Sequence, residues 1–192
     1  MAVTLTSCAT PQGPVLDRFE RLFADRVEAR HAAAVSSGTA GLHLCVRLAG
    51  IGPGDEVLVP ECTWVATASA VTYVGATPVM VDVQADTWCM DPEAAERAIT
   101  SRTRAMIPVH LYGQPADMLR LVPLARSRGL AIIEDAAPAL GATIRTAAGW
   151  RPVGGFGDIA CFSFQRSRHP RQSGARNGSC PKADDRCPRK CS

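Results

Sequence analysis

Hydrophobic positions follow two different spacings along the chain, one typical of helices and one typical of buried strands. Between residues 15 and 27, apolar side chains recur every three or four positions, which indicates an amphipathic helix. Beyond it, short runs rich in β-branched residues alternate with helical segments, as in a parallel sheet covered by helices. The expected strands span residues 33–36, 56–59, 77–83, 105–111, 130–135 and 158–164, and the further helices 39–49, 63–74, 92–99 and 117–128. This order predicts an α/β fold, a three-layer sandwich with a mostly parallel sheet.

Residues that favour helix ends lie at several of the expected boundaries. Asp91 and Asp117 can accept hydrogen bonds from first-turn amides and so begin a helix. Gly50, Gly75 and Gly129 can adopt the backbone conformation that ends one. The local signals therefore agree with the hydrophobic pattern.

Composition divides the chain into two unlike parts. The whole chain has 192 residues, 46% of them hydrophobic, and a net charge of +3, which is typical of a folded globular protein. Residues 166–192, however, contain eight Lys and Arg against two Asp, a net charge of +6, and none of the larger apolar residues. Such a segment cannot build a core, so we expect residues 1–165 to fold and residues 166–192 to form a basic, disordered tail.

The same patterns argue against several classes of protein. No apolar stretch is long enough for a membrane helix, and the start lacks a basic segment followed by an apolar one, so we expect a cytoplasmic protein without a membrane partner. The basic tail has no aromatic residues for stacking on bases, and we expect no nucleic acid partner. Cys180, Cys187 and Cys191 with His169 lack the CxxC spacing of zinc sites, and no metal is expected.

Two segments that follow strands offer groups for ligand binding. Small residues from Ser36 to Ala40 lead from a strand into a helix, where free amides and the helix dipole attract phosphate. An ordinary helix cap by Ser37 or Thr39 explains the same residues. Trp64 begins the helix after the next strand and can stack on a flat ring, although a tryptophan in this position is more often part of the core.

Two further candidates lie at the ends of later strands. Asp135 ends a strongly apolar strand, and a buried carboxylate there needs a cationic or hydrogen-bonding partner. A protonated pyridine nitrogen would be one such partner, and a helix cap is the alternative interpretation. Ser163 stands between aromatic neighbours and is either structural or a second hydroxyl for a phosphate.

Taken together, these segments resemble the DegT/StrS-type sugar aminotransferases, which are fold-type I enzymes dependent on pyridoxal 5'-phosphate (PLP). The resemblance covers nearly all of residues 15–165 and implies an incomplete large domain of such an enzyme. The motifs that carry it are Arg30 to Ala32, Ser36 to Leu42, Gly52 to Val57, Thr63 to Thr67, Gly75 to Val79 with Asp82, Ile107 to Gly113, Glu134 to Ala137, and Gly157 and Asp158 with Phe162 to Phe164.

The resemblance implies a role for each candidate residue. Trp64 would stack on the pyridine ring of PLP, and Asp135 would pair with the ring nitrogen. Pro138 stands where family members often have Gln or His near the ring, so one polar contact would be lost. The remaining implied contacts are with the cofactor phosphate, from Gly38, Thr39, Ala40 and Ser163.

The resemblance also implies a catalytic lysine that this chain lacks. Arg168 occupies the position of the family's Schiff-base lysine, and arginine remains protonated near neutral pH. The two lysines of the chain, Lys182 and Lys190, both lie in the basic tail. The abrupt change in composition after Gln165 favours the hypothesis of a shifted reading frame or a truncated gene over a divergent tail.

Three functions follow from the resemblance. The first is transfer of an amino group from glutamine or glutamate to a keto sugar or keto-cyclitol, in antibiotic or polysaccharide biosynthesis, by an enzyme expected to be a homodimer. We expect this activity to be impaired here by the loss of the Schiff-base lysine, replaced by Arg168, and of the family's C-terminal domain. The second is a non-catalytic fragment that at most binds PLP or an intact homologue. The third is a pyridoxamine-phosphate-dependent sugar dehydratase, in which His169 would replace the lysine although it lies one position away.

Overall fold

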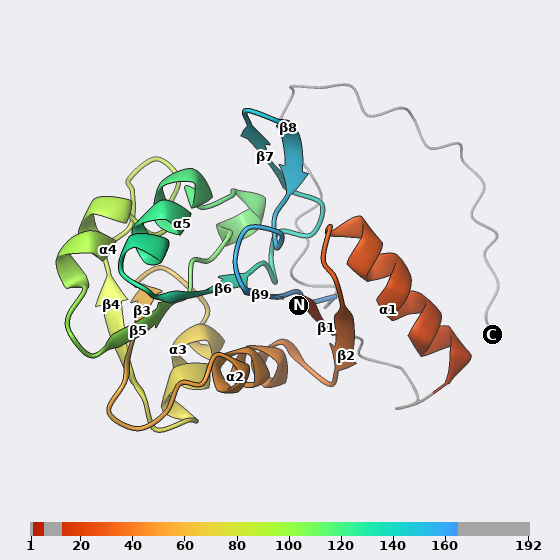
Figure 1. The fold of residues 1–192 in the computed structure, drawn as a ribbon, viewed down its shortest axis with the longest axis horizontal. Coiled ribbons are helices and arrows are strands. Elements are labelled where there is room, and N and C mark those ends of the chain that lie inside the picture. Colours follow the sequence, from red (N-terminus) through yellow and green to blue (C-terminus); the bar gives the residue numbers. More distant parts are fainter. Residues whose placement is uncertain (1, 6–12, 165–192) are drawn as a thin grey trace.

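The computed structural model describes residues 2–5 and 13–164, which form an α/β sandwich around a parallel sheet (Figure 1). The seven-stranded sheet has the order β2-β1-β9-β6-β5-β3-β4, and all of its pairs are parallel. Its strands are β1 (Ala2–Leu5), β2 (Ala32–Val35), β3 (Glu56–Pro60), β4 (Thr77–Val81), β5 (Thr103–Met106), β6 (Ala131–Asp135) and β9 (Ile159–Cys161).

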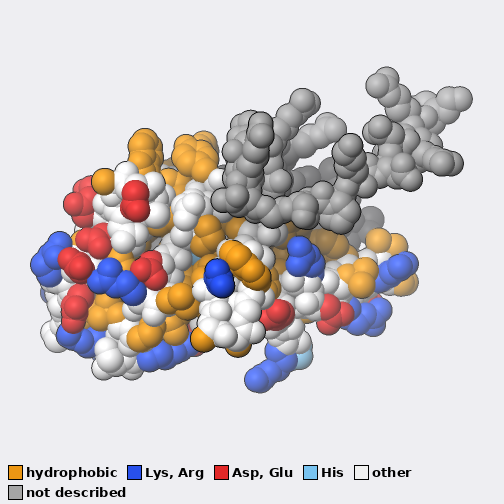
Figure 2. Space-filling view, turned by 90° about the horizontal axis from the view of Figure 1, so that it is seen from above, with side chains coloured by type: hydrophobic (Ala, Val, Ile, Leu, Met, Phe, Trp, Pro, Cys, Tyr) orange, Lys and Arg blue, Asp and Glu red, His pale blue; other side chains and the backbone are white. Residues whose placement is uncertain are grey.

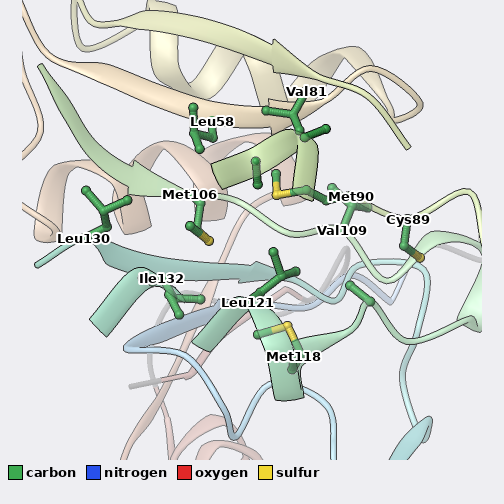
Figure 3. Packing of buried hydrophobic residues seen from close by; sticks show 14 of the residues in the cluster. Leu58, Val81, Cys89, Met90, Met106, Val109, Met118, Leu121, Leu130 and Ile132 are labelled. Carbon is green, nitrogen blue, oxygen red and sulfur yellow. The ribbon is translucent and has the colours of Figure 1, made fainter. Parts of the chain in front are cut away.

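Helices cover both faces of the sheet, which confirms the predicted three layers (Figure 1). On one face, α2 (Gly38–Leu48) and α3 (Val65–Thr72) pack against β3, β5, β6 and β9. On the other face lie α1 (Pro14–Arg26), α4 (Pro92–Ala98) and α5 (Met118–Ser127). Figure 3 shows part of this second core, in which Leu58, Met106 and Ile132 of three neighbouring strands meet Met118 and Leu121 of α5.

The helix boundaries agree closely with the capping signals in the sequence. The side chain of Asp91 accepts hydrogen bonds from the amides of Glu93 and Ala94, and Asp117 accepts one from Arg120. Gly50, Gly75 and Gly129 all have positive φ angles, as expected of residues that follow a helix. Local capping therefore defines the ends of these helices.

Two elements were not predicted. Strand β1 lies between β2 and β9, and the antiparallel hairpin of β7 (Thr143–Thr146) and β8 (Gly149–Pro152) precedes β9. Some expected strands are also too long. The run 105–111 leaves the strand after Met106 because Pro108 has no amide hydrogen, and it ends in the 3-10 turn η1 (Leu111–Gly113).

The surface formed by α4 and α5 is charged and mixed in sign. Arg120 of α5 pairs with Glu93 of α4, and Arg128, which follows α5, pairs with Glu96 of α4. Figure 2 shows acidic and basic side chains interspersed over this end of the molecule. No helix in the described part of the chain is long and apolar enough to cross a membrane. Residues 165–192, and with them the expected tail and its boundary, lie outside the described residues.

Candidate functional site

The candidate residues gather where the carboxyl ends of β6 and β9 meet the first turn of α2. Asp135 at the end of β6 is paired in register with Cys161 at the end of β9. The Sγ atom of Cys161 lies 3.6 Å from the carbonyl oxygen of Gly38, the first residue of α2. Because ligands of parallel sheets bind beyond the carboxyl ends of the strands, this edge is the candidate site.

The start of α2 offers backbone amides to an anion. Ser37 caps the helix, and its hydroxyl oxygen accepts a hydrogen bond from the amide of Ala40 at 3.2 Å. The cap interpretation is therefore confirmed, and it leaves the amides of Gly38 and Thr39 as the groups that can meet an anion. Gly38, Thr39 and Ala40 are half-buried, and their small side chains leave the first turn accessible.

Asp135 is a buried carboxylate held by two donors. Only 3% of its surface is exposed. Thr67 donates its hydroxyl hydrogen to Oδ2 at 2.8 Å, and the amide of Ala137 donates to Oδ1 at 3.1 Å. The bond to Ala137 is the local contact expected of a cap, but residues 136–142 form turns and no helix begins there. The carboxylate is thus fixed in position and can hold a cationic group of a ligand.

The charge of Asp135 also acts on a neighbouring thiol. Burial and, to a smaller extent, the nearby negative charge of Asp135 together raise the pKa of Cys45 in α2 to about 12. This coupling places α2 and the Asp135 carboxylate on the same side of the sheet. The thiol remains protonated and unreactive at neutral pH.

Trp64 is a surface residue and not a core residue. It is the N-cap of α3 and its side chain is 65% exposed, so the interpretation as a core residue is wrong. Its position links it to Asp135, because the hydroxyls of Thr63 and Thr67 on either side of it are 3.0 Å apart and Thr67 binds Asp135. A flat ligand bound at Asp135 would lie within reach of this part of α3.

Ser163 and Pro138 complete the set of described candidates. Ser163 follows β9 by two positions, is 5% exposed, and makes no hydrogen bond through its hydroxyl within the described residues. Buried hydroxyls are normally hydrogen-bonded, so this group is available to a ligand. Pro138 is half-buried in the turn after β6 and offers no polar side chain. Arg168 lies outside the described residues.

The pyridoxal phosphate group implied by the sequence fits these residues. Its phosphate needs amide and hydroxyl donors, which the start of α2 and Ser163 could supply, and its ring nitrogen needs a carboxylate, which Asp135 could supply. No group of three or more His, Cys, Asp or Glu side chains arranged to hold a metal is present in the part of the chain that the structure describes.

Sequence reasoning missed three residues that support the site. Thr67 was part of a recognised motif, and its position four residues after Thr63 on one helix was the available signal. His110 and Glu134 form a fully buried pair on the opposite face of the sheet, with Nε2 of His110 3.0 Å from Oε2 of Glu134. Their pairing joins separate strands and leaves no local trace in the sequence.

Comparison with known proteins agrees with the family resemblance found in the sequence. The model of the DegT/DnrJ/EryC1/StrS aminotransferase family matches residues 2–171. GDP-perosamine synthase of Caulobacter vibrioides is 47% identical over 83% of this chain and 42% of its own length. L-glutamine:2-deoxy-scyllo-inosose aminotransferase of Streptomyces kanamyceticus is 46% identical over 79% of this chain and 34% of its own length. The crystal structure of S. venezuelae DesV superposes with a TM-score of 0.75 and 51% identity, over 80% of this chain and 40% of that one. The chain thus spans less than half the length of the relatives it matches.

Proposed function

The chain belongs to the DegT/DnrJ/EryC1/StrS aminotransferase family, whose members are PLP-dependent, and on this premise we propose that residues 1–165 form the cofactor-binding part of a sugar aminotransferase. The reaction would transfer an amino group from glutamine or glutamate to a keto sugar or keto-cyclitol. Residues 166–192 would form the basic tail, which begins beside the cofactor with Arg168 at the position of the family's Schiff-base lysine.

The observation that carries the proposal is the buried carboxylate of Asp135. Burying a charge is costly unless partners compensate for it, and the hydroxyl of Thr67 and the amide of Ala137 both donate to this carboxylate. A pyridinium N–H would add a charged donor at this carboxylate. We therefore assign Asp135 the role of keeping the ring nitrogen of PLP protonated.

The phosphate of PLP would bind at the start of α2. The amides of Gly38 and Thr39 and the positive end of the helix dipole attract the phosphate oxygens. The amide of Ala40 already donates to the hydroxyl of Ser37, so Ala40 would contribute only a small side chain that keeps the first turn accessible. The buried hydroxyl of Ser163 would donate to the same phosphate from β9.

Trp64 and Pro138 would flank the ring between these two anchors. The indole of Trp64 is largely exposed and could stack on a flat aromatic ring. Pro138 lies three residues after Asp135 and would contact the ring without a polar bond. Together with Asp135 and the phosphate donors, they would fix the plane of the ring.

Bound PLP would act as an electron sink and carry the amino group between donor and acceptor. A residue of the chain must move a proton beside it, and Arg168 at the family's lysine position remains protonated near neutral pH. We therefore expect this chain to bind the cofactor but to transfer amino groups poorly. The Arg168→Lys variant would restore a group that can exchange a proton.

The names of two relatives support the substrate classes. One names GDP-perosamine, an amino sugar derivative, and the other names glutamine and 2-deoxy-scyllo-inosose, a cyclitol ketone. A keto sugar or a keto-cyclitol with glutamine as donor is the corresponding proposal here, in antibiotic or polysaccharide biosynthesis, with a homodimer as the active form.

The test compares the full chain with its Arg168→Lys variant. Both are titrated with PLP, treated with borohydride and mapped by peptide mass spectrometry. We expect saturable PLP binding by both, and a borohydride-fixed adduct at position 168 in the variant alone. Glutamine or glutamate should then change the PLP absorbance of the variant. Absence of saturable binding in both proteins would contradict the proposal, whereas binding without any amino transfer in the variant would favour a non-catalytic fragment.

A further inference from the structure

Glu134, the residue before Asp135, is as deeply buried as Asp135 but points to the other face of the sheet. Successive side chains of a strand alternate between faces, so Asp135 lies toward α2 and Glu134 lies toward the loop that precedes β9. Glu134 is fully buried. It contacts no part of the proposed cofactor site, and the proposed function assigns it no role.

The Glu134 carboxylate accepts four hydrogen bonds, three of them from backbone amides. Oε1 accepts from the amides of Phe156 and Gly157, and Oε2 accepts from the amide of Gly154 at 2.8 Å and from Nε2 of His110 at 3.0 Å. Three amides of one short loop, residues 154–157, therefore surround one carboxylate.

The loop can approach Glu134 this closely because of its glycines. A Cβ atom at Gly157 would lie 2.9 Å from the carbonyl oxygen of Ile132 and 3.2 Å from Cγ of Glu134. Gly154 has a φ of 86°, a conformation that favours glycine, and its amide points at the carboxylate. The loop is thus shaped around the Glu134 side chain.

His110 joins this cluster in a single tautomer. Its Nδ1 accepts a hydrogen bond from the amide of Ala116 at 3.0 Å, so Nδ1 carries no proton. The proton must then be on Nε2, which donates to Oε2 of Glu134. The pair therefore consists of a neutral imidazole and an ionised carboxylate, and it ties the segment after β5 to β6.

The strands on both sides of Asp135 are held through these contacts. On the β5 side, the amide of Asp135 donates to Pro108 and its carbonyl accepts from the amide of His110 at 3.0 Å. On the β9 side, the loop bound by Glu134 leads through Asp158 into β9, and the amide of Ala136 donates to the carbonyl of Cys161 at 2.9 Å. Ser163 follows two residues later.

We infer that Glu134 and His110 are positioning residues for the cofactor site: from the opposite face of the sheet they fix the distance between Asp135 and Ser163. The inference rests on the proposed function, because it assigns the pair a role in holding the two residues that would bind the ring nitrogen and the phosphate. It extends that function by two residues that would not touch the cofactor.

The test is the Glu134→Gln variant of the full chain, titrated with pyridoxamine 5'-phosphate, which forms no bond with lysine. Glutamine has one acceptor oxygen for four donors, so its NH₂ group must face either an amide hydrogen or Nε2–H of His110. We expect an affinity about tenfold weaker, or about 1.4 kcal/mol, because Asp135 and Ser163 would no longer be held at the distance that suits the ligand. We also expect an altered near-ultraviolet circular dichroism of the bound ligand and faster amide exchange over residues 154–163 in the free protein.

The matched control is Glu56→Gln. Glu56 is also a buried carboxylate bonded to Thr100 and Arg102, but it begins β3, two strands away from β6 in the sheet. The control should lose stability without changing affinity or the exchange of residues 154–163. His110→Gln, which keeps one donor and one acceptor, is a milder second variant if Glu134→Gln does not fold. It should weaken the affinity and speed the amide exchange of residues 154–163 by less than Glu134→Gln would.

Three results would decide the matter. Unchanged amide exchange of residues 154–163 in Glu134→Gln would overturn the inference. Faster exchange with unchanged ligand affinity and circular dichroism would also overturn it, because it would indicate a purely structural role. Failure of the wild-type chain itself to bind the ligand would instead overturn the proposed function and the inference with it. The wild-type titration therefore distinguishes the two failures.

Discussion

Thr67 donates its hydroxyl hydrogen to Oδ2 of Asp135 at 2.8 Å, joining α3 to the end of β6 across 68 positions of the chain. The hydroxyl of Thr63, one turn earlier, lies 3.0 Å from that of Thr67. This contact fixes one oxygen of the carboxylate and places the start of α3, with Trp64, beside the candidate site. Several predictions of the account depend on it or on its neighbours.

Replacing Thr67 by valine keeps the shape of the side chain and removes the donor to Asp135. We expect the free energy of unfolding to fall by about 1 to 3 kcal/mol, because the variant leaves a buried carboxylate with one donor fewer. The affinity for PLP should fall as well. Urea unfolding and a PLP titration measure the two effects. Thr72→Val on the same helix removes an exposed bond to Ser69 and should change neither.

Replacing Ser163 by alanine should separate ligand binding from stability. The hydroxyl makes no hydrogen bond within the described residues, so its removal should change the free energy of unfolding by less than about 0.5 kcal/mol. The affinity for PLP should fall several-fold, while that for pyridoxal without a phosphate should not. Equal losses for both ligands would show that Ser163 does not bind the phosphate.

The Glu134 carboxyl predicts a pH dependence of stability. Burial alone would raise its pKa, but the hydrogen bond from His110 and the amides of Gly157 and Gly154 outweigh burial and lower the pKa below its ordinary value. Such a group stabilises the fold above its unfolded pKa of about 4.3, and the stabilisation is lost as the pH falls through the folded pKa.

Wild type and Glu134→Gln should therefore differ most in unfolding free energy near neutral pH. The difference should shrink as the pH falls below about 4.3, where the carboxyl of the unfolded wild type takes up its proton, and should level off below the lower pKa of the folded protein. Urea unfolding at a series of pH values measures it. A difference that stays constant across the series would show that the carboxyl does not titrate as the structure requires.

The buried cysteines predict a pattern of thiol reactivity. Because burial and the charge of Asp135 raise the pKa of Cys45 to about 12, this thiol should resist alkylation in the folded protein at pH values near 8. Cys62, which is half-buried, should react faster. Iodoacetamide labelling followed by peptide mapping compares the two. Equal labelling of Cys45 and Cys62 in the folded chain would contradict the burial of α2 against Asp135.

The parts of the fold that were predicted correctly depend on local signals. Asp91 and Asp117 cap the helices that they precede, and Ser37 caps α2, because a cap is formed within four residues of the sequence. The strands β3 and β6 were found for the same reason, since a short apolar run is typical of a strand buried on both faces.

The parts that were missed depend on contacts between distant residues. Strand β1 has no distinctive pattern of its own and is a strand because β2 and β9 pair with it. The burial of His110 with Glu134 requires the 154–157 loop to close over β6. The exposure of Trp64 could not be read from the sequence either, because it depends on how α3 meets the sheet.

Only the resemblance to the family predicted that Asp135 and the start of α2 belong to the same site. The residues alone left a cap and a ligand contact equally open for Asp135. The structure shows the amide of Ala137 donating to one oxygen and the hydroxyl of Thr67 donating to the other, and the ligand contact stays a prediction. A buried carboxylate is evident from the sequence, but its partners are not.

The most direct test of the account is an equilibrium titration of the full chain and its Asp135→Asn variant with PLP, followed by absorbance and fluorescence. The account predicts saturable binding by the wild type and binding at least about tenfold weaker by the variant, because asparagine cannot offer a negative charge to the ring nitrogen. Equal affinity of the two proteins, or no saturable binding by the wild type, would contradict the assignment of this site to the cofactor.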